Sequence, residues 1–167
     1  ANVLGNLVSR TTAMAQKYFD GHLGAGGQSE ALDEELKTLA AEVWANYTRH
    51  MDNFQFSLGL NEAFKLISRA NKYIDETAPW ILAKSEETKP RLLTVLKNLC
   101  ECIRLSAILI SPVMPASAEA ILNQLNVPAE ARTLESLVYA DDHAWKTEVS
   151  APLFPRIDLD KELAALE

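Results

Sequence analysis

The chain has 167 residues, of which 48% are hydrophobic, so a single domain of this length buries a sizeable core. Sixteen Lys and Arg against twenty-three Asp and Glu give a net charge of −7, which argues against a general nucleic-acid coat protein and against a protein that binds anionic membranes. The charge is uneven, with eight basic and five acidic residues from Lys65 to Arg104 and nine acidic and four basic residues from Glu130 to Glu167, which predicts a basic and an acidic side of the surface.

The first predicted helix runs from Ala1 to Asp20 and is amphipathic at about 100° per residue. Its apolar arc contains Val3, Leu4, Leu7, Val8, Thr11, Met14, Ala15, Tyr18 and Phe19. On its polar arc, Asn6 and Arg10 lie one turn apart, and Lys17 lies two turns beyond Arg10. Asn and Arg can each offer two coplanar hydrogen bonds to a base edge. The simpler alternative is that these side chains face water, as most polar side chains do.

A glycine-rich segment, Gly21–Ser29, follows this helix and holds four of the six glycines. A phosphate-binding glycine loop requires a preceding buried strand and a Lys-Ser/Thr ending, and the sequence predicts neither here. We therefore interpret the segment as a flexible connection between helices.

Four more helices are predicted from apolar residues at helical spacing, with prolines near most of their ends. They run from Ala31 to about Met51, from about Leu60 to Thr77 or Ala78, from about Glu86 to Ile110, and from about Ala116 to Leu125, and residues 53–59 form a turn. The helix from Glu86 is expected to bury one side, formed by Leu92, Leu93, Leu96, Leu99, Ile103, Ala107 and Ile110.

The last forty residues carry shorter signals. Leu134–Tyr139 predicts one or two helical turns, Trp145 has polar neighbours, and Pro152 and Pro155 favour an extended segment. We see no alternating strand pattern in the sequence. The predicted fold class is therefore all-α, a bundle of about five helices with an irregular C-terminal segment.

The expected location is the cytoplasm. The sequence has no apolar run near the roughly 18 residues of a membrane span, and it has no signal-peptide pattern. Cys100 and Cys102 are two residues apart in a helical pattern and point to nearly opposite faces, which argues against a disulfide and favours a reducing compartment. Because the chain begins at Ala1 inside a helical pattern, we expect a fragment of a longer protein or a processed product.

The sequence offers little for catalysis. His22, His50 and His143 lack metal-ligand spacing, and neither cysteine lies at a predicted helix start, where its pKa would fall. The pairs of adjacent acidic residues in the sequence are expected to lie on the solvated surface. We therefore expect no catalytic residue and no metal site in this chain.

Trp80 follows the helix-breaking Pro79 and lies near Lys72, Lys84, Lys89 and Arg91 in the sequence. An exposed aromatic ring among basic side chains is typical of proteins that stack single-stranded bases. The pattern alone slightly favours the other interpretation, in which Trp80 plugs the end of the helical core, as we also expect of Trp44.

Four motifs carry a family resemblance, and they occur in order along almost the whole chain. They are LGNLVSRT (Leu4–Thr11), NKYIDETAPW (Asn71–Trp80), SPVMP (Ser111–Pro115) and PLFPRID (Pro152–Asp158). Together they resemble the helical anticodon-binding domain of bacterial methionyl-tRNA synthetases, which are class Ia aminoacyl-tRNA synthetases. The synthetases for leucine, isoleucine, valine and cysteine share the helical domain but lack this combination.

The resemblance implies that residues 1–158 form an anticodon-binding domain and residues 159–167 a linker or chain end. In the family this domain follows the catalytic domain and recognises the CAU anticodon of methionine tRNA. Carried over by motif position, Asn6, Arg10 and Trp80 contact the anticodon, and the Trp80 ring stacks on its first base. Lys17, Lys72 and Lys84 are weaker candidates for RNA contact.

The resemblance also bears on cofactors and partners. The adenylation signatures and the knuckle cysteines of the family are absent, so ATP and any zinc ion are expected only in the catalytic part of the parent enzyme. The expected partners are methionine tRNA and the catalytic domain of the same chain, without a membrane, and we expect a monomer. Two alternatives stay open: a helical protein–protein interaction module, and the anticodon-binding domain of another class Ia synthetase.

Overall fold

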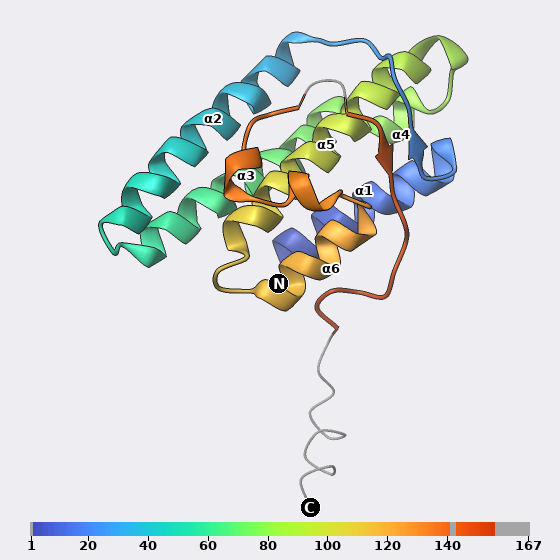
Figure 1. Ribbon diagram of the computed structural model, residues 1–167. Helices are drawn as coiled ribbons and strands as arrows, with labels where there is room; N and C mark the ends of the chain where they lie inside the picture. Colours follow the sequence, from blue (N-terminus) through green and yellow to red (C-terminus); the bar gives the residue numbers. More distant parts are fainter. Residues whose placement is uncertain (1, 141–142, 156–167) are drawn as a thin grey trace, which may run out of the picture.

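The computed structural model describes residues 2–140 and 143–155 as a bundle of five helices of ten residues or more (Figure 1). These are α1 (Asn2–Phe19), α2 (Ala31–Asp52), α3 (Phe56–Thr77), α5 (Lys89–Ile110) and α6 (Pro115–Gln124). A single turn, α4 (Pro79–Leu82), follows α3, and three 3-10 turns lie at η1 (Glu86–Thr88), η2 (Ala129–Ala131) and η3 (Leu134–Ser136). The all-α prediction is confirmed. The predicted linker 159–167 lies outside the described residues.

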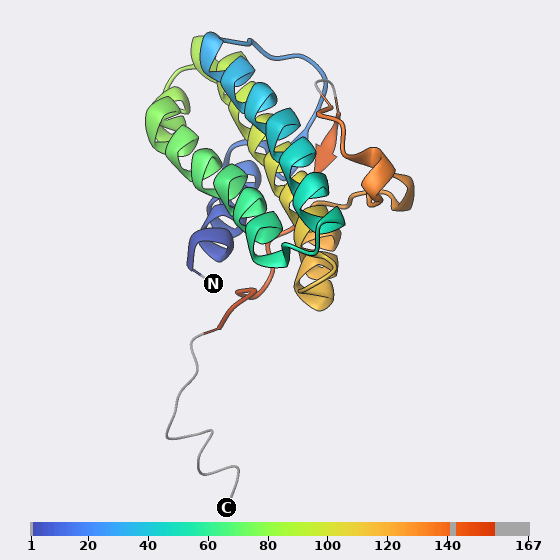
Figure 2. The ribbon, with the colours of Figure 1, turned by 90° about the vertical axis from the view of Figure 1, so that its left-hand side faces the viewer.

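The central helix is α5, against which α1, α2, α3 and α6 all pack (Figure 2). From Arg91 to Ile110 every residue is buried except the half-buried Leu93. The prediction of one buried side was therefore too narrow, because helices surround α5. One pair of its polar residues lies within the helix, where Arg104 Nη2 donates to Glu101 Oε1 at 2.7 Å. Arg104 also donates to carbonyls of the C-terminal segment, which fastens that segment to α5.

Helix α3 begins at Phe56, one turn earlier than the predicted start near Leu60. The connection from α2 is correspondingly tight, with Phe54 in the left-handed region at φ 58°. The predicted end of α3 is confirmed at Thr77. Ala78 then turns the chain at φ 42°, and Pro79 occupies the first position of α4, where its missing N–H costs nothing.

The glycine-rich segment connects α1 and α2, as predicted, and it also makes specific contacts with the rest of the fold, which the sequence did not predict. It contains β1 (His22–Leu23), which pairs antiparallel with β2 (Trp145–Lys146), and the Gln28 N–H donates to the Pro90 carbonyl at 3.1 Å and to Thr94 Oγ1 at 2.7 Å. Gly27 has φ 128° and a Cβ there would collide with Thr94 Oγ1, so only glycine fits. Strands of two residues are too short to show alternation in the sequence. Trp145, the first residue of β2, is buried despite its polar neighbours in the sequence.

Candidate nucleic-acid interface

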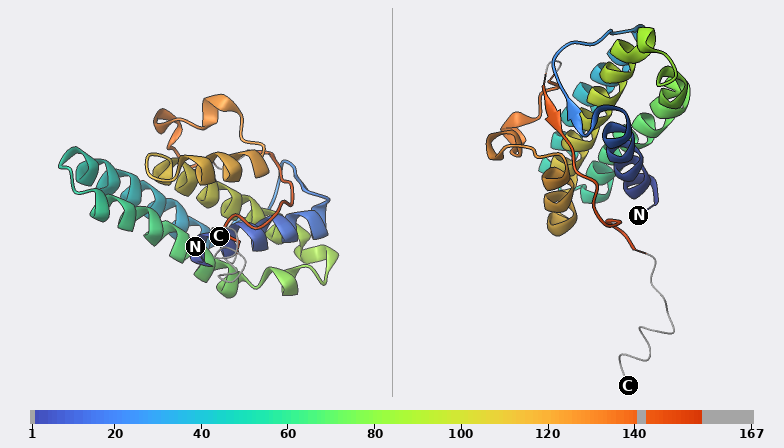
Figure 3. Two further views of the ribbon diagram at one scale, coloured as in Figure 1. Left: turned by 90° about the horizontal axis from the view of Figure 1, so that it is seen from below. Right: turned by 90° about the vertical axis from the view of Figure 1, so that its right-hand side faces the viewer.

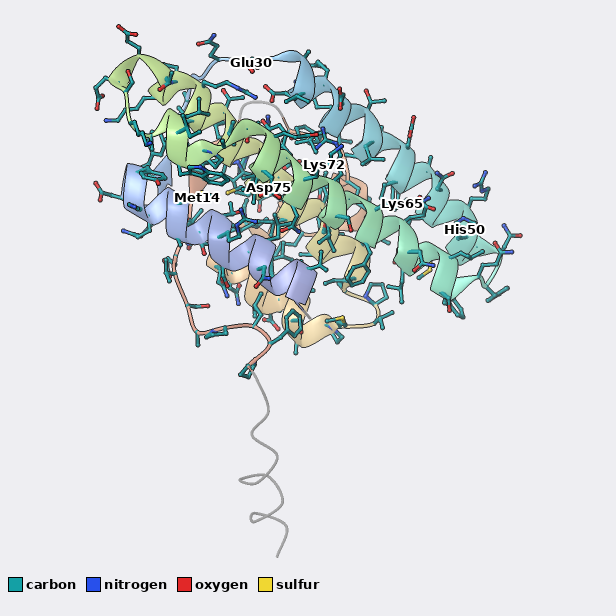
Figure 4. The ribbon with its side chains drawn as sticks, turned by 180° about the vertical axis from the view of Figure 1, so that it is seen from behind. Met14, Glu30, His50, Lys65, Lys72 and Asp75 are labelled. Carbon is teal, nitrogen blue, oxygen red and sulfur yellow. The ribbon has the colours of Figure 1, made fainter. Side chains whose placement is uncertain are left out.

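Helices α1 and α3 run side by side in the same direction, and α1 supplies most of the residues of the candidate site. Asn71 Nδ2 donates to the Val3 carbonyl at 3.1 Å, and further along both helices Arg10 Nη2 donates to Asp75 Oδ1 at 3.2 Å. Figure 4 shows Met14 of α1 next to the part of α3 that carries Asp75. Helix α3 ends at Thr77, and Ala78 turns the chain into α4, whose Trp80 lines a pocket together with residues from the second half of α1.

Trp80 lies in α4 at the open side of this arrangement. Trp80 is 44% exposed, whereas the neighbouring Pro79 is buried. The ring forms one wall of an open pocket of about 360 Å³. The other lining residues come from α1, namely Arg10, Ala13, Met14, Lys17 and Tyr18. Trp80 therefore does not plug the core, and its ring is available on a surface that α1 completes.

Asn6 and Arg10 occupy the solvent side of α1, as predicted. Asn6 is exposed and lies one turn before Arg10, outside the residues that line the pocket. The Arg10 side chain is 41% exposed, and its guanidinium group is paired with Asp75, which is 68% exposed. An ion pair this exposed contributes about 0–1 kcal/mol, so the guanidinium group can exchange Asp75 for another planar partner at low cost.

The three candidate lysines differ in their surroundings. Lys17 lines the pocket, and its ammonium group lies 5.3 Å from the centre of the Tyr18 ring. Lys72 lies 3.2 Å from Glu76, which also accepts from Arg69 at 2.8 Å. Burial would raise the pKa of Glu76, but the two cations that share its carboxylate hold it below its ordinary value. Lys84 is exposed and has no ion pair within residues 2–140 and 143–155.

Comparison with known proteins decides the family. Residues 23–159 match the family described as the anticodon binding domain of methionyl tRNA ligase. This chain belongs to that family. It is 48% identical to a methionine–tRNA ligase of Caldanaerobacter subterraneus and 40% identical to one of Lactococcus lactis, with all of this chain aligned to 26% and 25% of those proteins. The chain thus spans about a quarter of the length of these relatives.

Solved structures agree with the family assignment. A Mycobacterium tuberculosis methionyl-tRNA synthetase bound by methionyl-adenylate is 32% identical and superposes with a TM-score of 0.86, covering 93% of this chain and 31% of that one. The apo form of the same synthetase gives a TM-score of 0.87 over 95% of this chain and 32% of that one. The helical bundle is therefore the fold of the anticodon-binding domain in these synthetases.

One basic residue near Trp80 in the sequence is not at the surface of this anticodon-binding domain. The Arg91 side chain is 5% exposed, and its guanidinium group donates to both carboxylate oxygens of the fully buried Asp33, at 2.7 and 2.9 Å. It also donates to the Tyr73 hydroxyl at 3.3 Å. Arg91 is therefore not one of the basic side chains exposed around Trp80, as its place in the sequence suggested, and it joins α2, α3 and α5 instead. Lys89 is paired with Glu86 at 2.7 Å.

Sequence reasoning missed Met14 and Tyr18 as parts of the pocket, because both fall on the apolar arc of α1. Both are half-buried and partly open beside α4, and Met14 lies near the edge of that arc. An apolar residue at the edge of the arc, next to Lys17, was the available signal.

The described residues show little that could support catalysis. In that part of the chain no group of three or more His, Cys, Asp or Glu side chains is arranged to hold a metal ion. Burial raises the pKa of the Cys100 and Cys102 thiols, which keeps them protonated and poorly nucleophilic. None of the helices in residues 2–140 and 143–155 is long and apolar enough to cross a membrane.

Proposed function

We propose that this domain binds the anticodon loop of methionine tRNA and selects the CAU anticodon for a parent methionyl-tRNA ligase. The observation that carries the proposal is the pocket in which the half-exposed Trp80 ring faces Arg10 and Lys17 of α1. An aromatic face, a planar donor and a positive charge meet there, which is the combination that unstacked bases require. Membership of the family supports the same conclusion.

The proposed chemistry follows from the donor and acceptor groups of the first anticodon base. Its ring stacks on Trp80, and its pairing edge lies toward the exposed side of α1. Arginine has only donors, so Arg10 suits the adjacent O2 and N3 acceptors of cytosine and opposes the N3–H donor of uracil. The Asn6 amide oxygen can accept from the cytosine amino group. Each good bidentate contact contributes about 1–3 kcal/mol of discrimination.

The test is binding of this chain to two anticodon stem–loops, CAU and UAU, followed by fluorescence anisotropy at low salt. We expect at least a tenfold preference for CAU, because one bidentate contact is lost with uracil. Equal binding of both loops would refute sequence recognition and leave an electrostatic role. Failure of a folded sample to bind either loop would favour the alternative of a protein–protein interaction module.

Charging of methionine tRNA is assigned to the parent chain. The relatives are named methionine–tRNA ligases and are about four times as long as the stretch that matches this chain. In the proposed arrangement the remaining part of the parent activates methionine with ATP and holds any zinc ion, while this domain, as a monomer, supplies the anticodon contacts.

We expect Lys17→Ala and Lys84→Ala to weaken both stem–loops equally. These ammonium groups attract phosphates and do not read bases, so each lost phosphate contact lowers the dependence of log K on log salt by about 0.7 for single-stranded RNA. A salt titration by anisotropy measures this slope. Lys65→Ala is the control, because Lys65 lies on α3 away from the pocket and is paired with Glu62. An unchanged slope in the Lys17→Ala, Lys84→Ala double variant would exclude these contacts.

A further inference from the structure

The wall that α1 gives to the pocket at Trp80 carries a positively charged residue near each end. Its residues, in order along the helix, are Arg10, Ala13, Met14, Lys17 and Tyr18. Arg10 and Lys17 are two turns apart, so about 10 Å of helix separates them. The left view of Figure 3 shows the end of α1 beside the segment that contains α4. The two cations are thus attached at opposite ends of the wall, with apolar side chains between them.

This separation corresponds to the two sides of one nucleotide. The pairing edge of a base and its ribose–phosphate lie on opposite sides of the ring. When the base stacks on Trp80 with its pairing edge toward Arg10, its sugar and phosphates therefore lie toward Lys17. An ammonium group acts as a point charge and binds a phosphate well, whereas a base edge calls for planar donors such as guanidinium.

The side chain of Lys17 is directed by the ring of the next residue. Its Nζ lies 5.3 Å from the centre of the Tyr18 ring, within the range of a cation–π contact. Consecutive side chains on a helix do not face each other, so this contact requires the Lys17 side chain to bend across Tyr18. No carboxylate among residues 2–140 and 143–155 forms a salt bridge with Lys17. Its charge is therefore open to an anion that enters the pocket.

Tyr18 is suited to hold this ammonium group because the fold anchors its ring. Tyr18 is half-buried and packs against the core, whereas Lys17 is exposed. A lysine side chain has a flexible four-carbon stem, and binding to a phosphate costs it rotamer freedom. Contact with an anchored ring removes part of that freedom before RNA binds, which lowers the cost of the phosphate contact.

We propose that Tyr18 is a positioning residue that holds the Lys17 ammonium group at a phosphate adjoining the first anticodon nucleotide. This inference rests on the proposed function, because it takes the first base to stack on Trp80. It fixes the direction of the nucleotide along α1, with the pairing edge at Arg10 and the phosphate at Lys17. The rival is a purely structural role, since a lysine in the last turn of a helix also stabilises the helix dipole.

Proton NMR of the free chain tests the contact between the two side chains. Protons above the face of an aromatic ring resonate upfield, so the Lys17 ε-methylene protons should lie upfield of their position in Tyr18→Leu. Tyr18→Phe keeps the ring face and should leave them where they are in wild type. Identical positions of these protons in wild type and in Tyr18→Leu would overturn the proposal.

Anisotropy titrations with the CAU and UAU stem–loops test the consequence for RNA binding. Tyr18→Leu keeps an apolar side chain but loses the ring face, so we expect both loops to bind two- to fivefold more weakly, with a salt slope closer to that of Lys17→Ala. Tyr18→Phe should bind like wild type. The matched control is Phe19→Leu, because Phe19 is the neighbouring half-buried aromatic residue and does not line the pocket. Equal losses in Tyr18→Leu and Phe19→Leu, or in Tyr18→Leu and Tyr18→Phe, would overturn the proposal.

A double-mutant cycle identifies the phosphate and excludes a purely structural role. In the Lys17→Ala background, Tyr18→Leu should cause no further loss of affinity, because the group that it positions is gone. A CAU loop with a neutral methylphosphonate on one side of a 2′-O-methylated first anticodon nucleotide should lose as much affinity as Lys17→Ala loses with the ordinary loop. The same linkage should abolish the effect of Tyr18→Leu. Additive losses, with the methylphosphonate placed on either side of that nucleotide, would overturn the proposal.

The outcomes distinguish this inference from the proposed function. CAU-dependent binding without coupling between Tyr18 and Lys17 refutes the positioning role alone. Coupling between them with equal affinity for the CAU and UAU loops upholds the phosphate contact and refutes sequence recognition. Failure of the folded chain to bind either loop refutes both.

Discussion

Trp80→Ala is expected to weaken binding of the CAU stem–loop by about ten- to a hundredfold, because stacking on an aromatic ring contributes about 1–3 kcal/mol per base. The substitution should weaken RNA binding and hardly change the stability of the fold, since Trp80 is 44% exposed and Pro79 is the buried residue of α4. Fluorescence anisotropy measures the affinity, and circular dichroism confirms that the helical content is unchanged.

Trp80→Phe is the matched control for the Trp80→Ala result. Phenylalanine keeps an aromatic face in the pocket, so Trp80→Phe should retain most of the affinity that Trp80→Ala loses. It should do so for the CAU and UAU loops alike. Trp44→Phe serves as a second control, because Trp44 is half-buried against Tyr47, with ring centroids 6.3 Å apart on α2. Undiminished binding of CAU by Trp80→Ala would remove Trp80 from the site.

Asp33→Ala is expected to lower the free energy of unfolding by about 3–5 kcal/mol, since it leaves the Arg91 charge buried without its partner. Asp33 is fully buried and accepts from Arg91, from the Tyr73 hydroxyl at 2.5 Å and from the Glu30 N–H at 2.9 Å. Its loss therefore also breaks the capping box at the start of α2. Urea unfolding at pH 7 measures the change.

Glu34→Ala provides the control for Asp33→Ala, because Glu34 is the next residue of α2 but its side chain is 67% exposed and forms an exposed ion pair with Lys37 at 2.9 Å. Its replacement should cost less than about 1 kcal/mol. Asp33→Leu combined with Arg91→Met removes both charges and should recover much of the loss. A loss of stability for Asp33→Ala no larger than for Glu34→Ala would mean that the ion pair does not join the helices.

The same carboxylate predicts a pH dependence. Burial alone would raise the pKa of Asp33, but hydrogen bonds from Arg91 and Tyr73 outweigh it and hold the pKa below its ordinary value. With a folded pKa below the unfolded value of about 3.9, the contribution is present above that value and is lost as the pH falls through the folded pKa. The stability difference between wild type and Asp33→Asn should thus be constant near neutral pH and shrink in acid.

The sequence by itself determined the helices and the family. The apolar spacing of α1 and α2 and the proline at position 79 are local signals, so the bounds of α1 and α2, the end of α3 at Thr77 and the corner at Trp80 followed from them. The solvent side of α1, with Asn6 and Arg10, followed from the same periodicity. The four ordered motifs pointed to the anticodon-binding family that the comparisons show.

Only the tertiary structure decided which residues meet across the chain. The sequence suggested that Arg91 is a surface cation, but in the fold it is buried in an ion pair with Asp33, 58 positions earlier. The sequence suggested that Gly27 belongs to a flexible segment, but Thr94 of α5 lies where a Cβ of Gly27 would be. In the same segment, β1 pairs with a strand that is more than a hundred residues away in the chain. Trp80 became a pocket wall because α1 lies beside α4. Local spacing sets which side of a helix is apolar, whereas burial and pairing depend on neighbours that only folding brings together.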